Sequence, residues 1–402
     1  MRACRSCFGH ELEEVLDLGA QPWGNDFIQI GLNKQAVSYP LRLYFCHSCS
    51  MVQIDHTVPK ELMFVDHSYM SGTTKSLKQH FESVGKMIFE RYDMTGTRIL
   101  DIGGNDGTFL EYFNDQGVQV LNVESAHRQA TESQNKNIET MHEFFNLETA
   151  KTIFAEYGTM RVIHGSGVLF HLEELHSVFE GIEILLDENG VLIAEFIYLP
   201  GMVANCAYDQ IYHEHLLYYS LFSLQKLLGQ FGLEIFDSAL VKIHGGSCVA
   251  HIARKGKYEP SHAFKSMLHA EISDRMETVG VYQAFGKKSL QQREIMQSTI
   301  ADLKSANQRI HALGAPVKGS TIINFCDLSN NEIECAVEIN PYKFGTYVPG
   351  TLIPVLDEHK VEPPDVYLLL AWNFAEEILP RFANFRASSG KFLIPIPTPK
   401  LI

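Results

Sequence analysis

The stretch that decides the fold is Arg98-Ile99-Leu100-Asp101-Ile102-Gly103-Gly104-Asn105-Asp106-Gly107-Thr108-Phe109-Leu110. An apolar run, a glycine-rich turn and a second apolar run predict a strand, a tight turn and a helix. Glycine lets the backbone bend sharply and approach a ligand closely, as in the first βα turn of nucleotide-binding sheets. We therefore expect the turn to contact a cofactor through Gly103, Gly104, Asn105, Asp106 and Gly107.

The turn departs from the dinucleotide pattern G-x-G-x-x-G, because the third glycine at that spacing is missing. An acid, Glu124, follows at the end of the next predicted strand, residues 118–123. A glycine turn followed by such an acid suits an adenosyl group, because the carboxylate would accept hydrogen bonds from both ribose hydroxyls. An NAD-dependent enzyme is the weaker interpretation, and an ordinary βα turn with a chance acid is the structural alternative.

Strands and helices continue to alternate after this turn. Residues 160–164 and 190–196 are predicted strands, and residues 233–238 and 247–254 are spaced as a closing antiparallel hairpin. The loop after the first of these strands adds Ser166 to the expected cofactor site. This order predicts a doubly wound open sheet of seven strands.

The last part of the chain predicts a second α/β domain. Long helical patterns over residues 261–278 and 289–312 precede the loop Gly314-Ala315-Pro316-Val317-Lys318-Gly319. Backbone N–H groups of such a loop could cradle a phosphate, with Lys318 as the charge. A plain strand–turn–helix junction is the alternative.

Two C-x2-C pairs stand about forty residues apart near the N-terminus, and they are Cys4 with Cys7 and Cys46 with Cys49. Each tight turn presents two thiolates, so the pairs together suit tetrahedral zinc without an open coordination position. We expect a structural zinc site; four reduced cysteines or a redox pair would be the other explanation. His47 is interpreted as a bystander.

A second concentration of polar residues is Tyr208-Asp209-Gln210-Ile211-Tyr212-His213-Glu214-His215-Leu216, called here the 208–216 segment. Histidine beside carboxylates is typical of general acid–base chemistry. Two histidines at i and i+2 do not share one helical face, which disfavours a zincin-type metal site. A structural polar knot would be the alternative.

Composition limits the class of protein. The formal charge of −15 argues against broad nucleic-acid binding, and no apolar run is long enough to cross a bilayer. The N-terminus shows no apolar signal segment, so the expectation is a cytoplasmic enzyme, monomeric or homodimeric, without a membrane partner.

Several motifs together resemble one family, the zinc-containing sugar C-methyltransferases that modify nucleotide-linked deoxysugars. The matching motifs are the two C-x2-C pairs, Gly103-Gly104-Asn105-Asp106-Gly107-Thr108, Tyr212-His213-Glu214-His215, His244-Gly245-Gly246-Ser247, Gly314-Ala315-Pro316-Val317-Lys318-Gly319, Pro349-Gly350-Thr351 and Trp372-Asn373-Phe374. They lie in the expected order over essentially the whole chain. One departure is Gly165-Ser166-Gly167-Val168, where family members usually show Ala-Asn-Asn-Val, so the resemblance leaves the sugar itself open.

The resemblance implies a zinc-binding domain over residues 1–76, a class I methyltransferase domain over 77–256 and a C-terminal Rossmann-like α/β domain over 257–402. It implies S-adenosylmethionine as cofactor, structural Zn²⁺, and a dTDP-linked or GDP-linked 4-keto sugar as substrate. The residues that it implies for catalysis are His215, Tyr212, Glu214, His171 and Tyr69. The residues expected to contact the substrate are His244, Ser247, Lys318 and Tyr208.

The expected reaction is methylation of carbon 3, which becomes a nucleophile once a neighbouring 4-keto group acidifies its proton. His215 would remove that proton, because an imidazole with a pKa of roughly 6.5 is suited to the task near neutral pH. Tyr212 or His171 would donate to the enolate, and Glu214 would orient an imidazole or bind a hydroxyl. O- or N-methylation, and a non-catalytic scaffold that binds a nucleotide sugar, remain alternatives.

Overall fold

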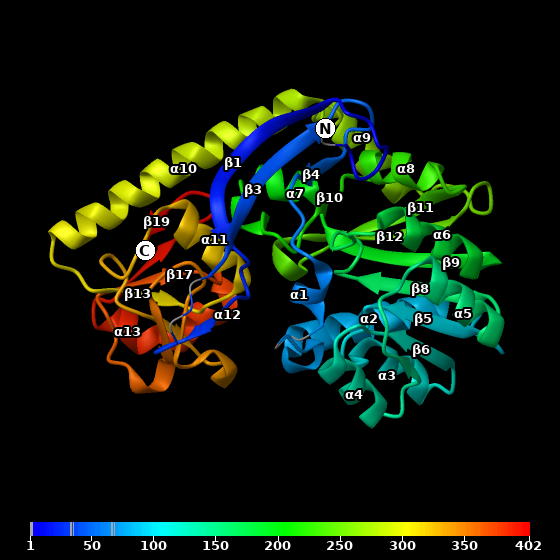
Figure 1. Ribbon diagram of the computed structural model, residues 1–402, viewed down its shortest axis with the longest axis horizontal. Coiled ribbons are helices and arrows are strands. Elements are labelled where there is room, and N and C mark those ends of the chain that lie inside the picture. Colours follow the sequence, from blue (N-terminus) through cyan, green and yellow to red (C-terminus); the bar gives the residue numbers. More distant parts are fainter. Residues whose placement is uncertain (1–2, 33, 35, 66, 68) are drawn as a thin grey trace.

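The computed structural model describes residues 3–32, 34, 36–65, 67 and 69–402. Its strands form three sheets, an N-terminal, a central and a C-terminal one (Figure 1). The long helix α10 (Val279–Ser305) runs along the top of the molecule from the N-terminal sheet to the C-terminal part.

The N-terminal sheet has four strands in the order β1-β3-β4-β10, and all recorded pairings are antiparallel. Its strands are β1 (Leu12–Pro22), β3 (Ser38–Cys46), β4 (Val52–Ile54) and β10 (Leu217–Tyr218). Because β10 directly follows the 208–216 segment, the end of that segment is paired into the N-terminal sheet.

The central sheet has the seven strands β5 (Arg98–Ile102), β6 (Gln119–Val123), β7 (Thr140–Met141), β8 (Met160–Ser166), β9 (Leu186–Ile197), β11 (Leu233–Val241) and β12 (Ser247–Arg254). Their order is β11-β12-β9-β8-β5-β6-β7, and β12 runs antiparallel to both neighbours. The helices of this part are α2 (Lys75–Arg91), α3 (Thr108–Asp115), α4 (His127–Asn135), α5 (Leu147–Tyr157), α6 (Leu175–Leu185), α7 (Leu199–Ala204) and α8 (Leu221–Gly229). The predicted doubly wound sheet of seven strands with a closing hairpin is confirmed.

The C-terminal sheet is built around five parallel strands, β16 (Pro354–Asp357), β14 (Ala336–Glu338), β13 (Ile310–Leu313), β17 (Val366–Leu369) and β18 (Lys391–Ile394). Antiparallel strands at its edges are β19 (Lys400–Leu401), β15 (Thr346–Tyr347) and β2 (Ile28–Gln29). Its helices are α11 (Val317–Phe325), α12 (Ala375–Ile378) and α13 (Ala383–Ala387). β2 comes from the N-terminal part of the chain, so that part touches this sheet too.

Short elements complete the chain: α1 (Lys60–Phe64), η1 (Ser71–Thr73), η2 (Tyr208–Gln210), η3 (Ile243–Gly245), η4 (Pro341–Lys343), η5 (Glu358–Lys360), η6 (Trp372–Phe374) and η7 (Leu379–Phe382). None of the helices in the described part of the chain combines the length and apolar character needed to cross a membrane.

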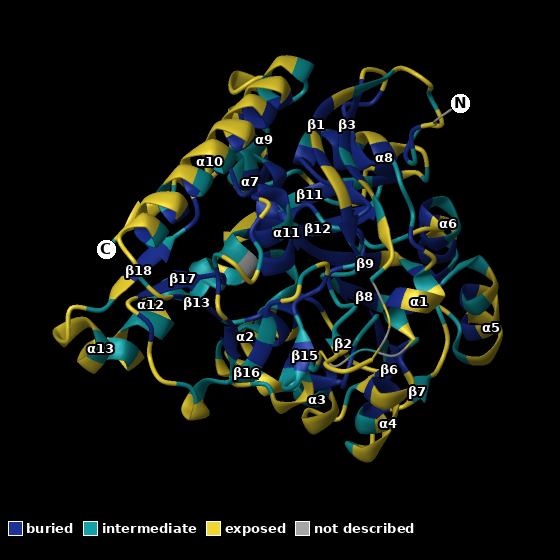
Figure 2. Cartoon of the chain, turned by 60° about the vertical axis from the view of Figure 1, so that its left-hand side comes forward, coloured by how far each residue is buried: buried dark blue, intermediate teal, exposed yellow. Residues whose placement is uncertain are grey.

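Two helices, α9 (His262–Ser273) and α10, link the central and C-terminal sheets. Figure 2 shows α10 exposed on its outer side and buried on its inner side. The prediction of one helix over residues 289–312 is wrong at both ends, because the apolar residues 310–313 form the buried strand β13. Where α10 crosses β1, a Cβ on Gly286 would lie 2.0 Å from the Val15 carbonyl oxygen, so only glycine permits this approach.

Each doubly wound sheet has a switch point at which its connections change side. In the central sheet it lies between β5 and β8, and in the C-terminal sheet between β13 and β17. Ligands of such sheets bind outside the carboxyl ends of the strands at this point. The glycine turn follows β5, and the Gly314 loop follows β13.

Candidate active site between the two doubly wound sheets

The glycine turn after β5 leaves no room for side chains. Gly103 and Gly107 have φ angles of +65° and +72°, which favour glycine. A Cβ on Gly104 would lie 2.4 Å from Asn122 Oδ1 and 2.6 Å from Asp101 Oδ2. The turn therefore requires glycine at these positions, as expected where a backbone approaches a ligand closely.

Residues of η1 cover the turn. The Ser71 N–H donates to Asn105 Oδ1 at 2.9 Å, and the Gly72 N–H donates to Asp106 Oδ2 at 3.0 Å. Asn105 and Asp106, both expected to contact the cofactor, therefore use their side chains to hold this cover. The backbone of Asn105 is engaged as well, because its carbonyl accepts from Asn122 Nδ2 at 3.1 Å.

Glu124 lies at the carboxyl end of β6 and is buried. Its Oε2 accepts the Asn105 N–H at 2.8 Å, and its Oε1 accepts the Ala126 N–H at 2.7 Å. Burial raises the pKa of this carboxyl, and the two backbone donors oppose the rise. Because each carboxylate oxygen accepts more than one hydrogen bond, the orientation that these donors fix suits the acceptance of ribose hydroxyls.

Ser166, at the end of β8, belongs to a buried polar chain. Its hydroxyl donates to Glu195 Oε1 at 3.1 Å, while Glu195 Oε2 lies 2.6 Å from His80 Nε2. Tyr69 lies in the same region, since Asp106 and Glu195 both act on its pKa. Half of the Tyr69 surface is accessible, yet the surrounding protein excludes enough water to raise its pKa to about 12.

The 208–216 segment crosses between the two sheets, and its two carboxylates are held by the only two tryptophans of the chain. Trp23 Nε1 donates to Glu214 Oε1 at 2.6 Å, and Trp372 Nε1 donates to Asp209 Oδ2 at 2.6 Å. Asn25 adds a bond of 2.8 Å to the same Glu214 oxygen. Both carboxyl groups have raised pKa values because they are buried, and the indole donors work against that rise.

His215 and His171 lie side by side, with ring centroids 5.1 Å apart. His215 Nδ1 lies 2.8 Å from the Gln210 carbonyl, and His171 Nδ1 lies 2.5 Å from the Glu214 carbonyl. A carbonyl only accepts, so each Nδ1 carries a hydrogen and is committed to that bond. Burial lowers the pKa of His171 to about 4, which keeps this ring neutral near pH ~7.

The Tyr212 ring packs against His215 at a centroid distance of 3.8 Å, with the two rings tilted by 38°. Burial raises its pKa well above the ordinary value, so the phenol stays protonated and can donate. Tyr212 or His171 was expected to donate to an enolate. In this geometry the His171 Nδ1 hydrogen is committed to the Glu214 carbonyl, whereas the Tyr212 phenol keeps a hydrogen to donate.

His213 points out of the cluster. Its Nε2 lies 3.3 Å from the Pro40 carbonyl, and its ring packs edge-on against Tyr39. Tyr208 is also away from the cleft: it is 1% exposed, and its hydroxyl lies 3.7 Å from Cys326 Sγ. The expectation of a substrate contact from Tyr208 is therefore not met, because its ring packs against Phe325 of α11.

Lys318, expected to be the phosphate cation, is already engaged. Its ammonium donates to Asn373 Oδ1 and lies 4.9 Å from the centre of the Trp372 ring, with Asp209 acting on its pKa. Ser247 is 2% exposed and donates to the Ile243 carbonyl. The backbone of η3 includes His244, whose side chain lies outside the described part of the structure.

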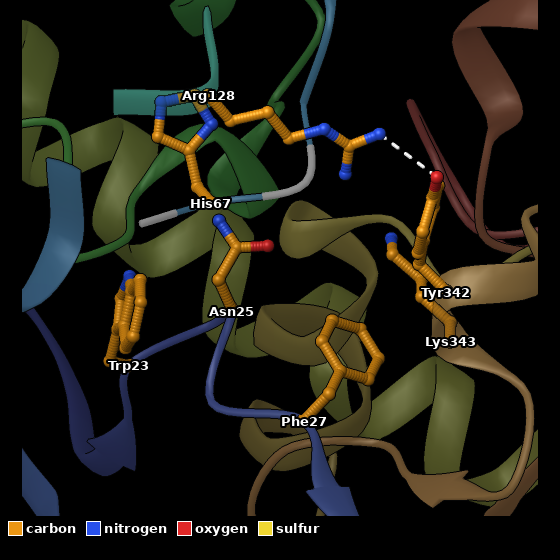
Figure 3. A pocket seen from close by; sticks show the side chains of 7 residues that line it. All are labelled: Trp23, Asn25, Phe27, His67, Arg128, Tyr342 and Lys343. Atoms are coloured by element: carbon orange, nitrogen blue, oxygen red, sulfur yellow. Dashed lines mark hydrogen bonds between the residues drawn. The ribbon is translucent and has the colours of Figure 1, made fainter. Parts of the chain in front are cut away.

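A pocket of about 290 Å³ opens beside this cluster (Figure 3). Its lining residues come from three parts of the chain, and they are Trp23, Asn25, Phe27, His67, Arg128, Tyr342 and Lys343. Trp23 and Asn25 also hold Glu214, so the pocket and the acid–base cluster share a wall.

The four expected zinc ligands come together at the N-terminus. Their sulfur atoms all lie within 4.8 Å of one another, with Cys4–Cys49 and Cys7–Cys46 Sγ distances of 3.6 Å. A tetrahedron with Zn–S bonds of ~2.3 Å has edges of roughly 3.8 Å, so the four thiolates fit the ion. His47 is turned to Glu13 Oε2, 2.9 Å away, and takes no part.

Sequence reasoning missed Trp23, Asn25, Arg128 and Lys343. The rarity of tryptophan in this chain was the one available signal for Trp23, which stands between Pro22 and Gly24. A Cβ on Gly24 would lie 2.6 Å from Val317 Cγ1, which shows how closely this N-terminal arm, residues 22–27, meets α11. Nothing in the local pattern around Arg128 or Lys343 distinguishes them from surface cations.

Comparison with known proteins gives matches along nearly the whole chain. A family model for a zinc binding domain matches residues 4–64, one for a methyltransferase domain matches residues 71–238, and one for a C-methyltransferase C-terminal domain matches residues 242–397. The C-methyltransferase NovU of Streptomyces niveus is 30% identical over 410 residues, which span 99% of this chain and 96% of that protein.

Two solved structures of methyltransferases each cover less than half of this chain. The magnesium protoporphyrin IX methyltransferase of Synechocystis PCC 6803 with bound SAM is 17% identical, covers 44% of this chain and 79% of its own, and has a TM-score of 0.34. The CcbJ methyltransferase from Streptomyces caelestis is 13% identical, covers 43% of this chain and 89% of its own, and has a TM-score of 0.35.

Proposed function

The chain belongs to the C-methyltransferase family that includes NovU, and within that family we propose that it methylates carbon 3 of a dTDP-linked 4-keto deoxysugar. It is a methyltransferase that depends on S-adenosylmethionine and carries a zinc-binding module. The sugar, its carbon 3 and the role of each side chain are our proposals.

The observation that supports the proposal is that the cluster around the 208–216 segment contains both a possible base and a hydrogen-bond donor. His215 and His171 each hold an Nδ1 hydrogen on a backbone carbonyl, so Nε2 is the nitrogen that would accept a proton, and the protonated phenol of Tyr212 packs against the His215 ring. A carbon acid beside a ketone needs such a set, namely a base for the C–H proton and a donor for the oxygen on which charge develops. A hydroxyl or amine acceptor would need the base alone.

His215 is the proposed base. Its Nδ1 hydrogen is fixed on the Gln210 carbonyl, so the lone pair that would take the C3 proton is at Nε2. Tyr212 donates to the C4 oxygen as the enolate forms. Glu214 holds His171 through its backbone carbonyl, while its carboxylate is fixed by Trp23 and Asn25.

S-adenosylmethionine, when bound, supplies the electrophilic methyl group. Gly103 and Gly104 would admit its amino-acid part through their backbone, and Glu124 would accept hydrogen bonds from its ribose hydroxyls. The hydrogen bonds of Ser71 and Gly72 hold η1 against the turn. These residues bind and orient the donor, and the 208–216 segment handles the proton.

The test is exchange of the C3 proton with deuterated solvent, without any methyl donor. We expect wild type to exchange the C3 hydrogen of a dTDP-linked 4-keto deoxysugar and, once S-adenosylmethionine is added, to give a product heavier by one methyl group. The His215→Asn variant should lose the exchange by a factor of about 10²–10⁴ while still binding S-adenosylmethionine.

Three results would overturn parts of the proposal. Methylation on oxygen or nitrogen without C3 exchange would remove the carbon-acid chemistry. A panel of dTDP- and GDP-linked 4-keto sugars that yields no methylated product would remove the substrate class. Normal exchange by His215→Asn would move the base to another residue, with His171 next in position.

A further inference from the structure

Among the described residues that line the pocket in Figure 3, two are cations and none carries a carboxylate. This is unexpected in a chain with a formal net charge of −15. Lys343 comes from η4 of the C-terminal part, and Arg128 comes from the first turn of α4 in the central part. The two side chains therefore approach the same space from opposite sides of the cleft.

Lys343 is enclosed without an ion-pair partner in the described part of the chain. Its ammonium donates to the Ala315 carbonyl at 2.8 Å and lies 4.7 Å from the centre of the Phe27 ring. Glu338 and Glu214 are near enough to act on its pKa, but both already accept hydrogen bonds from other groups. Burial lowers the Lys343 pKa because it removes water from the charged ammonium. An anion in the pocket would stabilise that charge.

Arg128 has a neutral partner. Its Nη2 donates to the Tyr342 hydroxyl at 2.9 Å, and its guanidinium lies 4.7 Å from the centre of the same ring. This pair spans the cleft, as the dashed line in Figure 3 shows. A guanidinium that gives up a phenol for an anion gains a charge-assisted hydrogen bond, and it binds phosphate with two parallel N–H donors.

The pocket is joined to the acid–base cluster. Trp23 and Asn25 line it, and through their donated hydrogen bonds they hold Glu214. A ligand seated between Lys343 and Arg128 therefore lies one side-chain layer from the cluster. The pocket volume of about 290 Å³ is that of roughly ten water molecules at ~30 Å³ each, which is room for a diphosphate.

We propose that this pocket is the diphosphate subsite of the enzyme, with Lys343 and Arg128 as its cationic contacts and Tyr342 as the group that Arg128 leaves when the ligand enters. The subsite deepens the proposed function, on which it rests for the identity of the ligand. Lys318, the cation expected from the sequence, is held by Asn373 and the Trp372 face and is not the diphosphate contact.

The experiment is isothermal titration of the zinc-loaded full chain with thymidine diphosphate, guanosine diphosphate and inorganic pyrophosphate, without sugar or methyl donor. We expect Lys343→Gln and Arg128→Gln each to weaken thymidine diphosphate binding about 10- to 100-fold. Arg128→Lys should recover part of the loss. Lys255→Gln removes one charge at an exposed position after β12 and should bind within about twofold of wild type. Thermal unfolding of each variant separates lost binding from lost folding.

The outcomes separate this subsite from the proposed substrate. If wild type binds thymidine diphosphate and both Gln variants bind it equally well, the subsite is wrong and the substrate class stands. If wild type binds pyrophosphate through Lys343 but no nucleoside diphosphate, the subsite stands and the nucleotide linkage falls. Binding of none of the three ligands would overturn both.

Discussion

Trp23 Nε1 donates a hydrogen bond of 2.6 Å to Glu214 Oε1 across 191 residues of sequence. The bond joins the N-terminal arm to the acid–base cluster, and Asn25 repeats the contact at 2.8 Å. The Glu214 carbonyl in turn receives the His171 Nδ1 hydrogen. The orientation of His171 is therefore linked to an arm that begins where β1, the first strand of the zinc-binding part, ends.

The first prediction concerns this bond. Trp23→Phe keeps an aromatic ring but removes the donor, which leaves a buried carboxylate with one partner fewer. We expect kcat to fall about tenfold or more, because a hydrogen bond to a charged group contributes roughly 1.5–3 kcal/mol. Steady-state kinetics measures it. Tyr157→Phe, which removes a donor to the exposed Glu139, is the matched control and should leave kcat unchanged. A normal kcat in Trp23→Phe would show that Glu214 needs no support from the arm.

The second prediction concerns the donor in the cluster. Tyr212→Phe preserves the ring packed against His215 but removes the hydroxyl that would donate to the developing oxyanion. Loss of one such donor lowers kcat by about 10²–10³. S-adenosylmethionine affinity, measured by calorimetry, should not change. A variant with kcat within threefold of wild type would exclude Tyr212 from this role.

The third prediction concerns the dependence of stability on pH. His171 has a pKa lowered to about 4 in the folded protein, against roughly 6.5 in an unfolded chain. Between these values the unfolded state binds more protons, so the stability contributed by His171 is complete above pH ~6.5 and is lost as the pH falls towards ~4.

Between pH ~6.5 and ~4, the His171→Asn variant should lose about 1–3 kcal/mol less stability than wild type, because it lacks the imidazole whose protonation favours the unfolded state. The ring is half-buried and partly solvated, which limits the size of this difference. Urea unfolding at several pH values measures the difference. His213 and His251 also have pKa values lowered to about 4, so the variant should retain part of the slope. An unchanged slope would mean that His171 titrates normally.

The fourth prediction concerns zinc. Cys4→Ser or a strong chelator should remove the ion and loosen the N-terminal module, since bound structural zinc contributes directly to folding. We expect a lower midpoint of thermal unfolding together with lower kcat, because the arm that holds Glu214 lies between the two cysteine pairs of this module. Cys206→Ser, a buried cysteine outside the cluster, should keep one zinc per chain by metal analysis. Full activity of the zinc-free enzyme would separate the module from catalysis.

The fifth prediction compares two glycines on α10. A Cβ on Gly286 meets the Val15 carbonyl at 2.0 Å, whereas a Cβ on Gly280 meets nothing within 4 Å. Gly286→Ala should lower the free energy of unfolding by about 1–3 kcal/mol or more through forced displacement of the helix from β1. Gly280→Ala should be neutral or stabilise by up to about 1 kcal/mol through helix propensity. Equal effects in urea unfolding would contradict the close crossing.

Features that depend on neighbours in sequence were predictable. The glycine turn, the strand–helix alternation and the hairpin follow from local apolar periodicity, and the Cys4, Cys7, Cys46 and Cys49 spacing is enough to suggest one ion. The C-terminal boundary of α10 was not predictable, because the apolar run at residues 310–313 fits a helix or a buried strand equally well. Only its position between the parallel strands β14 and β17 decides for a strand.

The sequence by itself determined the three-part organisation, the cofactor turn and the concentration of acid–base groups in the 208–216 segment. Only the tertiary structure decided what each polar group does. It placed Lys318 on Asn373, fixed the Nδ1 hydrogens of His171 and His215 on backbone carbonyls, and set Arg128 opposite Lys343. The reason is physical: a side chain's charge, tautomer and ligand depend on its hydrogen-bond partners, and here those partners come from distant parts of the chain.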